Sequence, residues 1–297
     1  MTIKVGSTPE SANHMSAPRR RASKVDTIRH AYGFDDVSLA PGPTTVEPAD
    51  VDTSVAFAGL SLEIPVLAAS MDAVVDVRSA GVLAGLGGLA VMNLEGVQMR
   101  YEDPTPVLER IATAGPDRAQ EVLSAAYEAP VTEAIVAARI GELHEAGSPA
   151  VISATPAAAR RWGPFCTEAG ADAFLVQSQV SSAQHLASGY EPLELAEFTR
   201  LMGIPVAAGN TTSYEAAAAL MEQGIAALFV GVGPGAACTT REVLGIGMPQ
   251  VTAISDVAAA RDEHFERTGV YIPVVGDGGM RRGGEMAKAI AAGADLV

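Results

Sequence analysis

Short runs of apolar residues recur along the chain, and each run ends in small or polar residues. An Ala-rich segment with helical spacing follows most runs, for example SYEAAAALMEQG at 213–224. Glycine-containing turns such as EAGADAF connect several of these segments to the next run, as left-handed helix ends do. Most runs start 22 to 31 residues apart, the length of one strand plus one crossover helix. The predicted strands are IPVLAAS (64–70), GLAVMN (88–93), PAVISAT (149–155), AFLVQSQ (173–179), IPVAAGN (204–210), ALFVGVG (227–233), IPVVGDGG (272–279) and DLV (295–297).

Seven strand–helix units and the start of an eighth predict an α/β fold, a (β/α)8 TIM barrel truncated at the start of strand eight. An open doubly wound sheet is the alternative. That fold would place a GxGxxG turn after its first strand, but GLGGLA (85–90) precedes a strand instead. Because the last run stops at Val297, we expect the first and seventh strands to keep unpaired edges. We interpret the sequence as a fragment of a longer protein.

The pattern also divides the chain. Residues 1–24 are polar and rich in Ser and Pro, which predicts a disordered N-terminal tail. Its run Arg19–Arg21 is either solvated or in contact with a phosphate or partner. Residues 25–297 are expected to form the barrel, C-terminally incomplete. The interval 94–148 holds helical stretches and no strand-rich inserted domain, and 236–271 predicts a long loop that leads into a helix.

Composition narrows the function classes. A net charge of −15 argues against non-specific binding to nucleic acid or to an anionic membrane. Two cysteines make no disulfide framework, which favours a reducing compartment, and we expect a cytoplasmic protein. We expect no membrane partner, because no apolar stretch reaches about 18 residues. The five histidines lack metal-ligand spacing, so a zinc site is not expected.

A glycine-rich loop follows the sixth predicted strand in LFVGVGPGAACTTR (228–241). Glycines allow positive φ and close approach of a ligand, and successive backbone groups of such a loop can bind a phosphate or a monovalent cation. A thiol at a barrel strand end is a candidate nucleophile, and Thr240 could orient a proton donor or a water. Cys238 is therefore either a nucleophile or a small buried residue in a tight turn.

Polar residues end other predicted strands as well. Asp277 precedes two glycines and a helix, an arrangement that suits the two hydroxyls of a ribose. The alternative is a helix N-cap. The same two alternatives, a functional residue or a helix N-cap, apply to Asp72 and Asn210. Asp72 follows Met71 after the first run, and Asn210 ends IPVAAGN.

Together these motifs resemble the IMP dehydrogenase / GMP reductase family. GFDDVSLAPGPTTV (33–46) is similar to the segment before its first strand, and IPVLAASMDAVVD (64–76) to its first-strand motif. GVGPGAACTTREVLGIGMPQVTAI (231–254) resembles its catalytic loop, and GDGGMRRGGEMAKAIAAGAD (276–295) its ribose-phosphate segment. The similarity runs from about residue 33 to the end. The bacterial IMP dehydrogenase-related branch, which lacks CBS domains, is the most similar.

The resemblance implies a purine nucleotide oxidoreductase that acts at purine C2 through a covalent thioimidate on Cys238. In the dehydrogenase direction, IMP, NAD+ and water give XMP and NADH. In the reductase direction, GMP and NADPH give IMP and ammonia. Thr240 matches the threonine that helps to position the water or ammonia. The family also implies NAD or NADP, a potassium ion and a homotetramer.

The other family roles fall mainly on predicted strand ends. The matching substrate-binding residues are Met71, Gly235, Ala236, Asp277, Gly278 and Gly279, the cofactor-binding residues are Gln177 and Asn210, and the potassium-binding carbonyls are those of Gly233, Gly235 and Cys238.

Three departures from the family pattern matter. Ala236 stands where the dehydrogenases usually have a phosphate-binding serine, and Gln177 stands where they have an aspartate that contacts the nicotinamide ribose. No CBS pair occupies 94–148. We expect the flap and the remaining catalytic groups beyond Val297, so that the fragment itself is inactive. A nucleotide-binding barrel without turnover is the alternative from another functional class.

Overall fold

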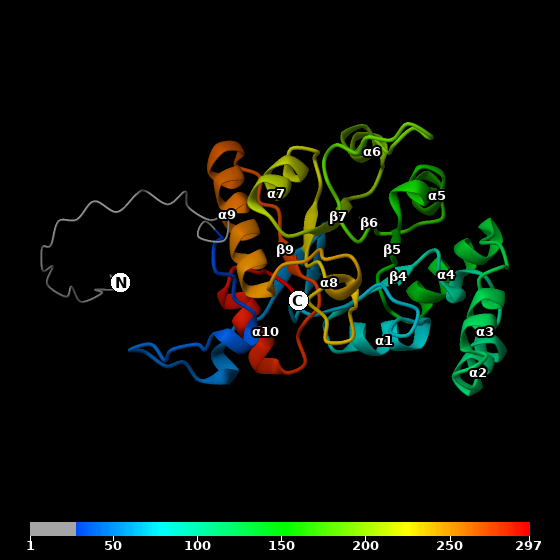
Figure 1. The fold of residues 1–297 in the computed structure, drawn as a ribbon, viewed down its shortest axis with the longest axis horizontal. Coiled ribbons are helices and arrows are strands. Elements are labelled where there is room, and N and C mark those ends of the chain that lie inside the picture. The colour runs from blue at the N-terminus through cyan, green and yellow to red at the C-terminus, as the bar shows by residue number, and fades with distance from the viewer. Residues whose placement is uncertain (1–27) are drawn as a thin grey trace, which may run out of the picture. The chain divides into compact units, whose positions relative to one another are not determined.

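Seven parallel strands, ordered in space as in sequence, form the main sheet of the computed structural model (Figure 1). The structure describes residues 28–297, so the predicted tail 1–24 lies outside the described residues. Residues from Ala31 onward form one compact unit. The strands are β3 (Leu67–Ala68), β4 (Leu89–Asn93), β5 (Val151–Ala154), β6 (Ala173–Gln177), β7 (Val206–Thr211), β8 (Ala227–Val230) and β9 (Val274–Gly276), and an antiparallel hairpin of β1 (Val55–Phe57) and β2 (Leu60–Leu62) precedes them.

The segment after the last helix lies between the first and last strands of this sheet. The Leu67 amide donates to the Val297 carbonyl at 2.7 Å, and the Gly276 amide donates to the Leu296 carbonyl at 2.8 Å. The prediction that both strands keep wholly unpaired edges is therefore wrong. The curled sheet confirms the truncated TIM barrel, in which residues 296–297 take the place of the eighth strand.

Helices alternate with the strands, as the Ala-rich segments predicted. Gly170, Gly224 and Gly293 have positive φ at the predicted turns into the following strands, which confirms those helix ends. Helices α7 and α9 lie side by side (Figure 1). The α-helices are α1 (Val77–Gly85), α2 (Thr105–Thr113), α3 (Ala119–Ala126), α4 (Glu133–Glu145), α5 (Pro156–Glu168), α6 (Leu195–Leu201), α7 (Tyr214–Met221), α8 (Thr240–Val243), α9 (Gln250–Thr268) and α10 (Gly283–Ala291), and the 3-10 helices are η2 (Phe34–Asp36), η3 (Pro48–Asp50) and η4 (Val97–Met99).

The strands are apolar up to the polar residues near their carboxyl ends, because both of their faces are buried. Alternate residues such as Val91 and Leu175 point into the barrel, while their neighbours, such as Met92, pack under the helices. Phe57 of the β1–β2 hairpin joins the interior cluster, where its ring meets the ring of Phe229 edge to face at 6.1 Å. The hairpin therefore contributes to the barrel core, a role that the sequence pattern did not predict.

The interval between β4 and β5 is helical, as predicted, and contains η4 and α2–α4. Buried Arg139 of α4 holds two parts of this interval together, because its guanidinium donates to the carbonyls of Gln98, Tyr101 and Glu102. In the range from residue 28 onward, no helix has the length and apolarity needed to cross a bilayer.

Candidate active site

A cavity of about 840 Å³ lies at the carboxyl ends of the strands, the end at which barrel enzymes carry their chemistry. All the site residues predicted from the sequence line it. This follows from parallel strand order, which brings the ends of β3 and β6 through β9 to one rim. The predicted residues in its wall are Met71, Gln177, Asn210, Gly233, Gly235, Ala236, Cys238, Thr240, Asp277, Gly278 and Gly279.

Cys238 presents an exposed thiol to this cavity. Its Sγ lies 3.2 Å from Oγ1 of buried Thr240. Hydrogen bonds with the Thr240 side chain and backbone, with a smaller contribution from the Arg241 charge, lower the pKa of the thiol. Cys166 behaves in the opposite way, because burial raises its pKa to about 12. Cys166 is a buried residue of helix α5, whereas Cys238 is exposed, so the interpretation of Cys238 as a buried residue is wrong.

The loop that carries Cys238 depends on its glycines. Gly231 and Gly233 have φ of 146° and 69°, and a Cβ on Gly233 would lie 2.9 Å from Arg241 Cγ. The Gly235 carbonyl accepts the Cys238 amide at 3.1 Å and closes a tight turn beside the thiol. Potassium binding by the loop carbonyls stays a prediction. Within residues 28–297 no group of three or more His, Cys, Asp or Glu side chains could hold a metal.

Asp277 lies directly after β9 and is held by two neutral amides. Its Oδ2 accepts Asn210 Nδ2 at 2.7 Å and Gln177 Nε2 at 3.0 Å. Gln177 Nε2 also donates to Asn210 Oδ1 at 2.9 Å. Burial raises the pKa of Asp277, and the two amide hydrogen bonds partly oppose that rise. The N-cap interpretation of Asp277 is wrong, because α10 has Arg282 at its N-cap.

The Gly278-Gly279 turn lies against the cysteine loop. Both residues have φ of 84°, and a Cβ on Gly279 would lie 3.0 Å from the Pro234 carbonyl oxygen. Only glycine combines this backbone conformation with so close an approach. The turn therefore joins the carboxylate of Asp277 to the loop of Cys238.

Two other N-cap interpretations are also wrong. Asp76, rather than Asp72, caps α1, and Ser213, rather than Asn210, caps α7. Asp72 instead accepts hydrogen bonds from the Val97 amide and the Tyr127 hydroxyl. Met71, beside it, is 56% exposed on the rim of the cavity.

Sequence reasoning placed Ser70 and Gln179 at strand ends without giving them a role, and it did not single out Ser153. Ser153, the third residue of β5, makes a hydrogen bond with Ser70 after β3. Gln179, two residues after β6, donates from Nε2 to Thr240 Oγ1 at 2.5 Å. The strand-end rule already pointed to these positions, but no local pattern indicated what their side chains contact.

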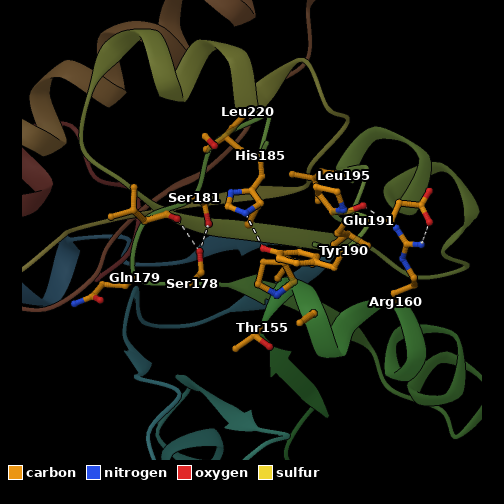
Figure 2. A pocket seen from close by; sticks show the side chains of 18 of the residues that line it. Thr155, Arg160, Ser178, Gln179, Ser181, His185, Tyr190, Glu191, Leu195 and Leu220 are labelled. Atoms are coloured by element: carbon orange, nitrogen blue, oxygen red, sulfur yellow. Dashed lines mark hydrogen bonds and ion pairs between the residues drawn. The ribbon is translucent and has the colours of Figure 1, made fainter. Parts of the chain in front are cut away.

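A second cavity of about 840 Å³, whose lining Figure 2 shows, shares part of its wall with the first. Apolar side chains such as Leu195 and Leu220 form part of its wall. His185 and Tyr190 stack with ring centroids 6.0 Å apart, and Arg160 pairs with Glu191 at 2.8 Å. The residues common to both cavities are Thr155, Ser178, Gln179 and Thr240. The shared wall places the second cavity next to Cys238.

Comparisons with known proteins show the family of this chain. The model of the IMP dehydrogenase / GMP reductase domain matches residues 31–297. An uncharacterized oxidoreductase of Mycolicibacterium smegmatis is 36% identical over 91% of this chain and 74% of its own. Inosine-5'-monophosphate dehydrogenase of Methanocaldococcus jannaschii is 28% identical over 92% of this chain and 72% of its own.

A solved structure is also similar to most of this chain. It is the IMP dehydrogenase/GMP reductase-like protein of Corynebacterium glutamicum, which superposes with a TM-score of 0.84 at 29% identity and covers 91% of this chain and 72% of its own. With its barrel, its cysteine loop and its strand-end carboxylate in one cavity, this chain belongs to the IMP dehydrogenase / GMP reductase family.

Proposed function

We propose that the protein is a purine nucleotide oxidoreductase of the IMP dehydrogenase type, with Cys238 as its nucleophile. Family membership supports the oxidoreductase class. The observation that carries the specific proposal is one cavity that holds an exposed, acidified thiol and the carboxylate of Asp277 together. The carboxylate suits a ribose diol and the thiol suits attack on an electron-poor ring carbon.

The chemistry balances with two co-reactants, a hydride acceptor and water. The Cys238 thiolate would form a bond to C2 of IMP, and the hydrogen at C2 would leave as hydride to NAD+. Water then adds to C2, the carbon–sulfur bond breaks, and XMP and the free thiol result. Thr240, 3.2 Å from Sγ, is the group placed to orient the water or stabilise the thiolate. Splitting the reaction at a covalent intermediate lowers each barrier.

The nucleotide would lie along the first cavity. Asp277 would accept the ribose hydroxyls, while the backbone of Gly235, Ala236, Gly278 and Gly279 would face the phosphate and Met71 the base. Because Ala236 has no hydroxyl, phosphate recognition there rests on backbone amides. The carbonyls of Gly233, Gly235 and Cys238 would bind potassium, and we expect a cytoplasmic homotetramer.

The second cavity fits a dinucleotide. It adjoins the thiol, its wall is largely apolar, and the His185–Tyr190 pair offers an aromatic surface for a flat ring. Bound there, NAD or NADP would supply the hydride acceptor. The family resemblance in the sequence implied that Gln177 and Asn210 bind the cofactor, but their amides donate to Asp277. We therefore propose that both residues serve the IMP site rather than the cofactor site, because they hold the Asp277 carboxylate that would bind the ribose.

The proposal can be tested by following NADH or NADPH through its absorbance at 340 nm, with the full-length protein as the enzyme. We expect a rise with IMP and NAD+, whereas a fall with GMP and NADPH would indicate the reductase direction. Cys238→Ala should lower turnover by more than about a thousandfold and leave IMP binding, measured by calorimetry, near the wild-type level. Cys166→Ala is the matched control, because that thiol lies outside the cavity.

Two results would contradict the proposal. Normal turnover of Cys238→Ala would exclude the covalent mechanism. Tight IMP binding with no change at 340 nm in either direction would favour a barrel that binds a nucleotide without turnover.

A further inference from the structure

The second cavity carries an ion pair in one part of its wall. Among the described residues that line it, Arg160 of α5 and Glu191 of the loop before α6 are the only members of the Arg, Lys, Asp and Glu classes. Arg160 donates from Nη1 to Glu191 Oε2 at 2.8 Å and from Nη2 to the Pro192 carbonyl at 2.7 Å. Figure 2 shows this pair on one side of the cavity and Gln179 on the other. The charged end therefore lies away from Gln179, which also lines the first cavity.

An aromatic pair lies next to these charges. The rings of His185 and Tyr190 stack with an interplanar angle of 28°, and His185 Nε2 lies 2.7 Å from the Tyr190 hydroxyl. Tyr190 directly precedes Glu191 in the chain, so the aromatic surface and the carboxylate come from one short segment. A flat ring surface beside a few polar groups is the combination that suits a nucleoside, with its base on the rings and its sugar at the charges.

The position of the thiol determines which half of a dinucleotide would lie there. Cys238 attacks the nucleotide in the first cavity, so the nicotinamide has to lie at the shared wall, which includes Gln179 and Thr240. The adenosine half then extends toward the opposite end of the second cavity. Its ribose would lie at the ion pair, and NAD and NADP differ only at the 2′ position of that ribose.

The ion pair treats the two 2′ groups differently. A 2′-hydroxyl can donate to Glu191 while Arg160 stays paired, because a carboxylate accepts more than one hydrogen bond. A 2′-phosphate has to draw Arg160 away from Glu191 and from the Pro192 carbonyl, and it then lies beside the negative charge of Glu191. No second Arg or Lys lines this cavity within the described chain to compensate that repulsion.

We propose that the Arg160–Glu191 pair determines the cofactor specificity of the second cavity and selects NAD over NADP, because Glu191 withholds the arginine from a 2′-phosphate. The inference rests on the proposed function, since it takes the second cavity as the dinucleotide site. It goes beyond that function by naming the dinucleotide that fits and the two side chains that discriminate.

Calorimetry in the Cys238→Ala background measures dinucleotide binding without turnover. With saturating IMP, we expect this full-length variant to bind NAD+ at least about tenfold more tightly than NADP+, because bringing like charges together is costly. Adding Glu191→Gln keeps the shape of the side chain and removes its charge. NADP+ should then bind about tenfold more tightly than before. NAD+ should bind more weakly than before, because an amide oxygen accepts the 2′-hydroxyl less strongly than a carboxylate does.

Two further variants separate the pair from the general charge of the protein. Arg160→Gln should weaken NADP+ further and leave NAD+ close to its starting affinity, because Glu191 remains to accept the 2′-hydroxyl. Glu121→Gln removes one carboxylate from an exposed ion pair with Arg118, outside both cavities. It makes the same change in net charge as Glu191→Gln and should leave the ratio of the two affinities unchanged.

Three results would overturn the inference: NADP+ bound as tightly as NAD+ before any change in the pair, an unchanged ratio after Glu191→Gln, or an equal change after Glu121→Gln. In each case IMP and a dinucleotide still bind, so the proposed function stands. Binding of neither dinucleotide, with no change at 340 nm in the wild-type protein, would instead contradict the proposed function and the inference with it.

Discussion

The carboxylate of Asp277 has two neutral amides and no cation against its Oδ2 within the described chain. An aspartate at position 177, as the family's dehydrogenases usually have, would set two carboxylates against each other here. The Gln177 amide instead donates to Asp277 at 3.0 Å. At the scale of single residues, Gln177 departs from the family pattern but is complementary to its neighbour Asp277, because its amide can donate where a carboxylate would repel.

Gln177→Glu tests this pairing. The new carboxylate would face Asp277, and mutual repulsion would raise the pKa of the pair, so that it takes up a proton as the pH falls. We expect IMP affinity to fall about tenfold at pH 8 and to recover toward pH 6, as measured by calorimetry. Gln120→Glu adds the same charge at an exposed site and should show neither effect. An equal loss at both pH values would contradict the charge argument.

At the scale of elements, helix α10 holds the turn that follows Asp277. The Glu285 carboxylate accepts the backbone amides of Arg281 and Arg282, at 2.5 and 3.2 Å, and the Arg281 guanidinium. These bonds satisfy amides at the start of the helix that have no partner within it. They lower the pKa of Glu285 to about 2, mainly through the Arg281 side chain. The first turn of α10 is therefore fixed by one carboxylate.

Glu285→Gln should weaken the fold in a pH-dependent way. The pKa of Glu285 is lowered from 4.5 in the unfolded chain to about 2 in the folded one. Its contribution to stability is therefore fully present above pH 4.5 and is lost as the pH falls toward 2. We expect the variant to unfold at a lower temperature at pH 7, with a smaller difference at pH 3. Glu121→Gln, at an exposed pair with Arg118, is the control, and a pH-independent difference would contradict this prediction.

At the scale of the whole molecule, the β1–β2 hairpin contributes to the barrel interior through Phe57. Its side chain is fully buried and contacts Phe229 of β8. Phe57→Ala should lower the free energy of unfolding by about 3–5 kcal/mol, measured by denaturant titration, because it leaves a cavity in the core. Phe265 of α9 is 45% exposed, so Phe265→Ala should lower the free energy of unfolding by clearly less. Equal costs would show that Phe57 does not contribute to the core.

Much of the fold followed from local pattern, and the exceptions have physical causes. The strand order, the helical interval 94–148 and the glycine helix ends were predicted because each leaves a periodic or conformational mark in the sequence. The first strand was overestimated: IPVLAAS contributes only the two residues of β3. The pairing of residues 296–297 with both edges was missed. Its contact with β9 is local, but its contact with β3 joins segments far apart in the sequence.

For the candidate site, the sequence by itself determined which residues gather at one rim, because parallel strands end together. It also determined the glycines that let the loop of Cys238 lie against the turn after Asp277. Only the tertiary structure decided what each side chain contacts there. The bond between Gln177 and Asp277 spans 100 residues, and that between Gln179 and Thr240 spans 61. Such contacts depend on strand register and on the curl of the sheet, which no short stretch of sequence encodes.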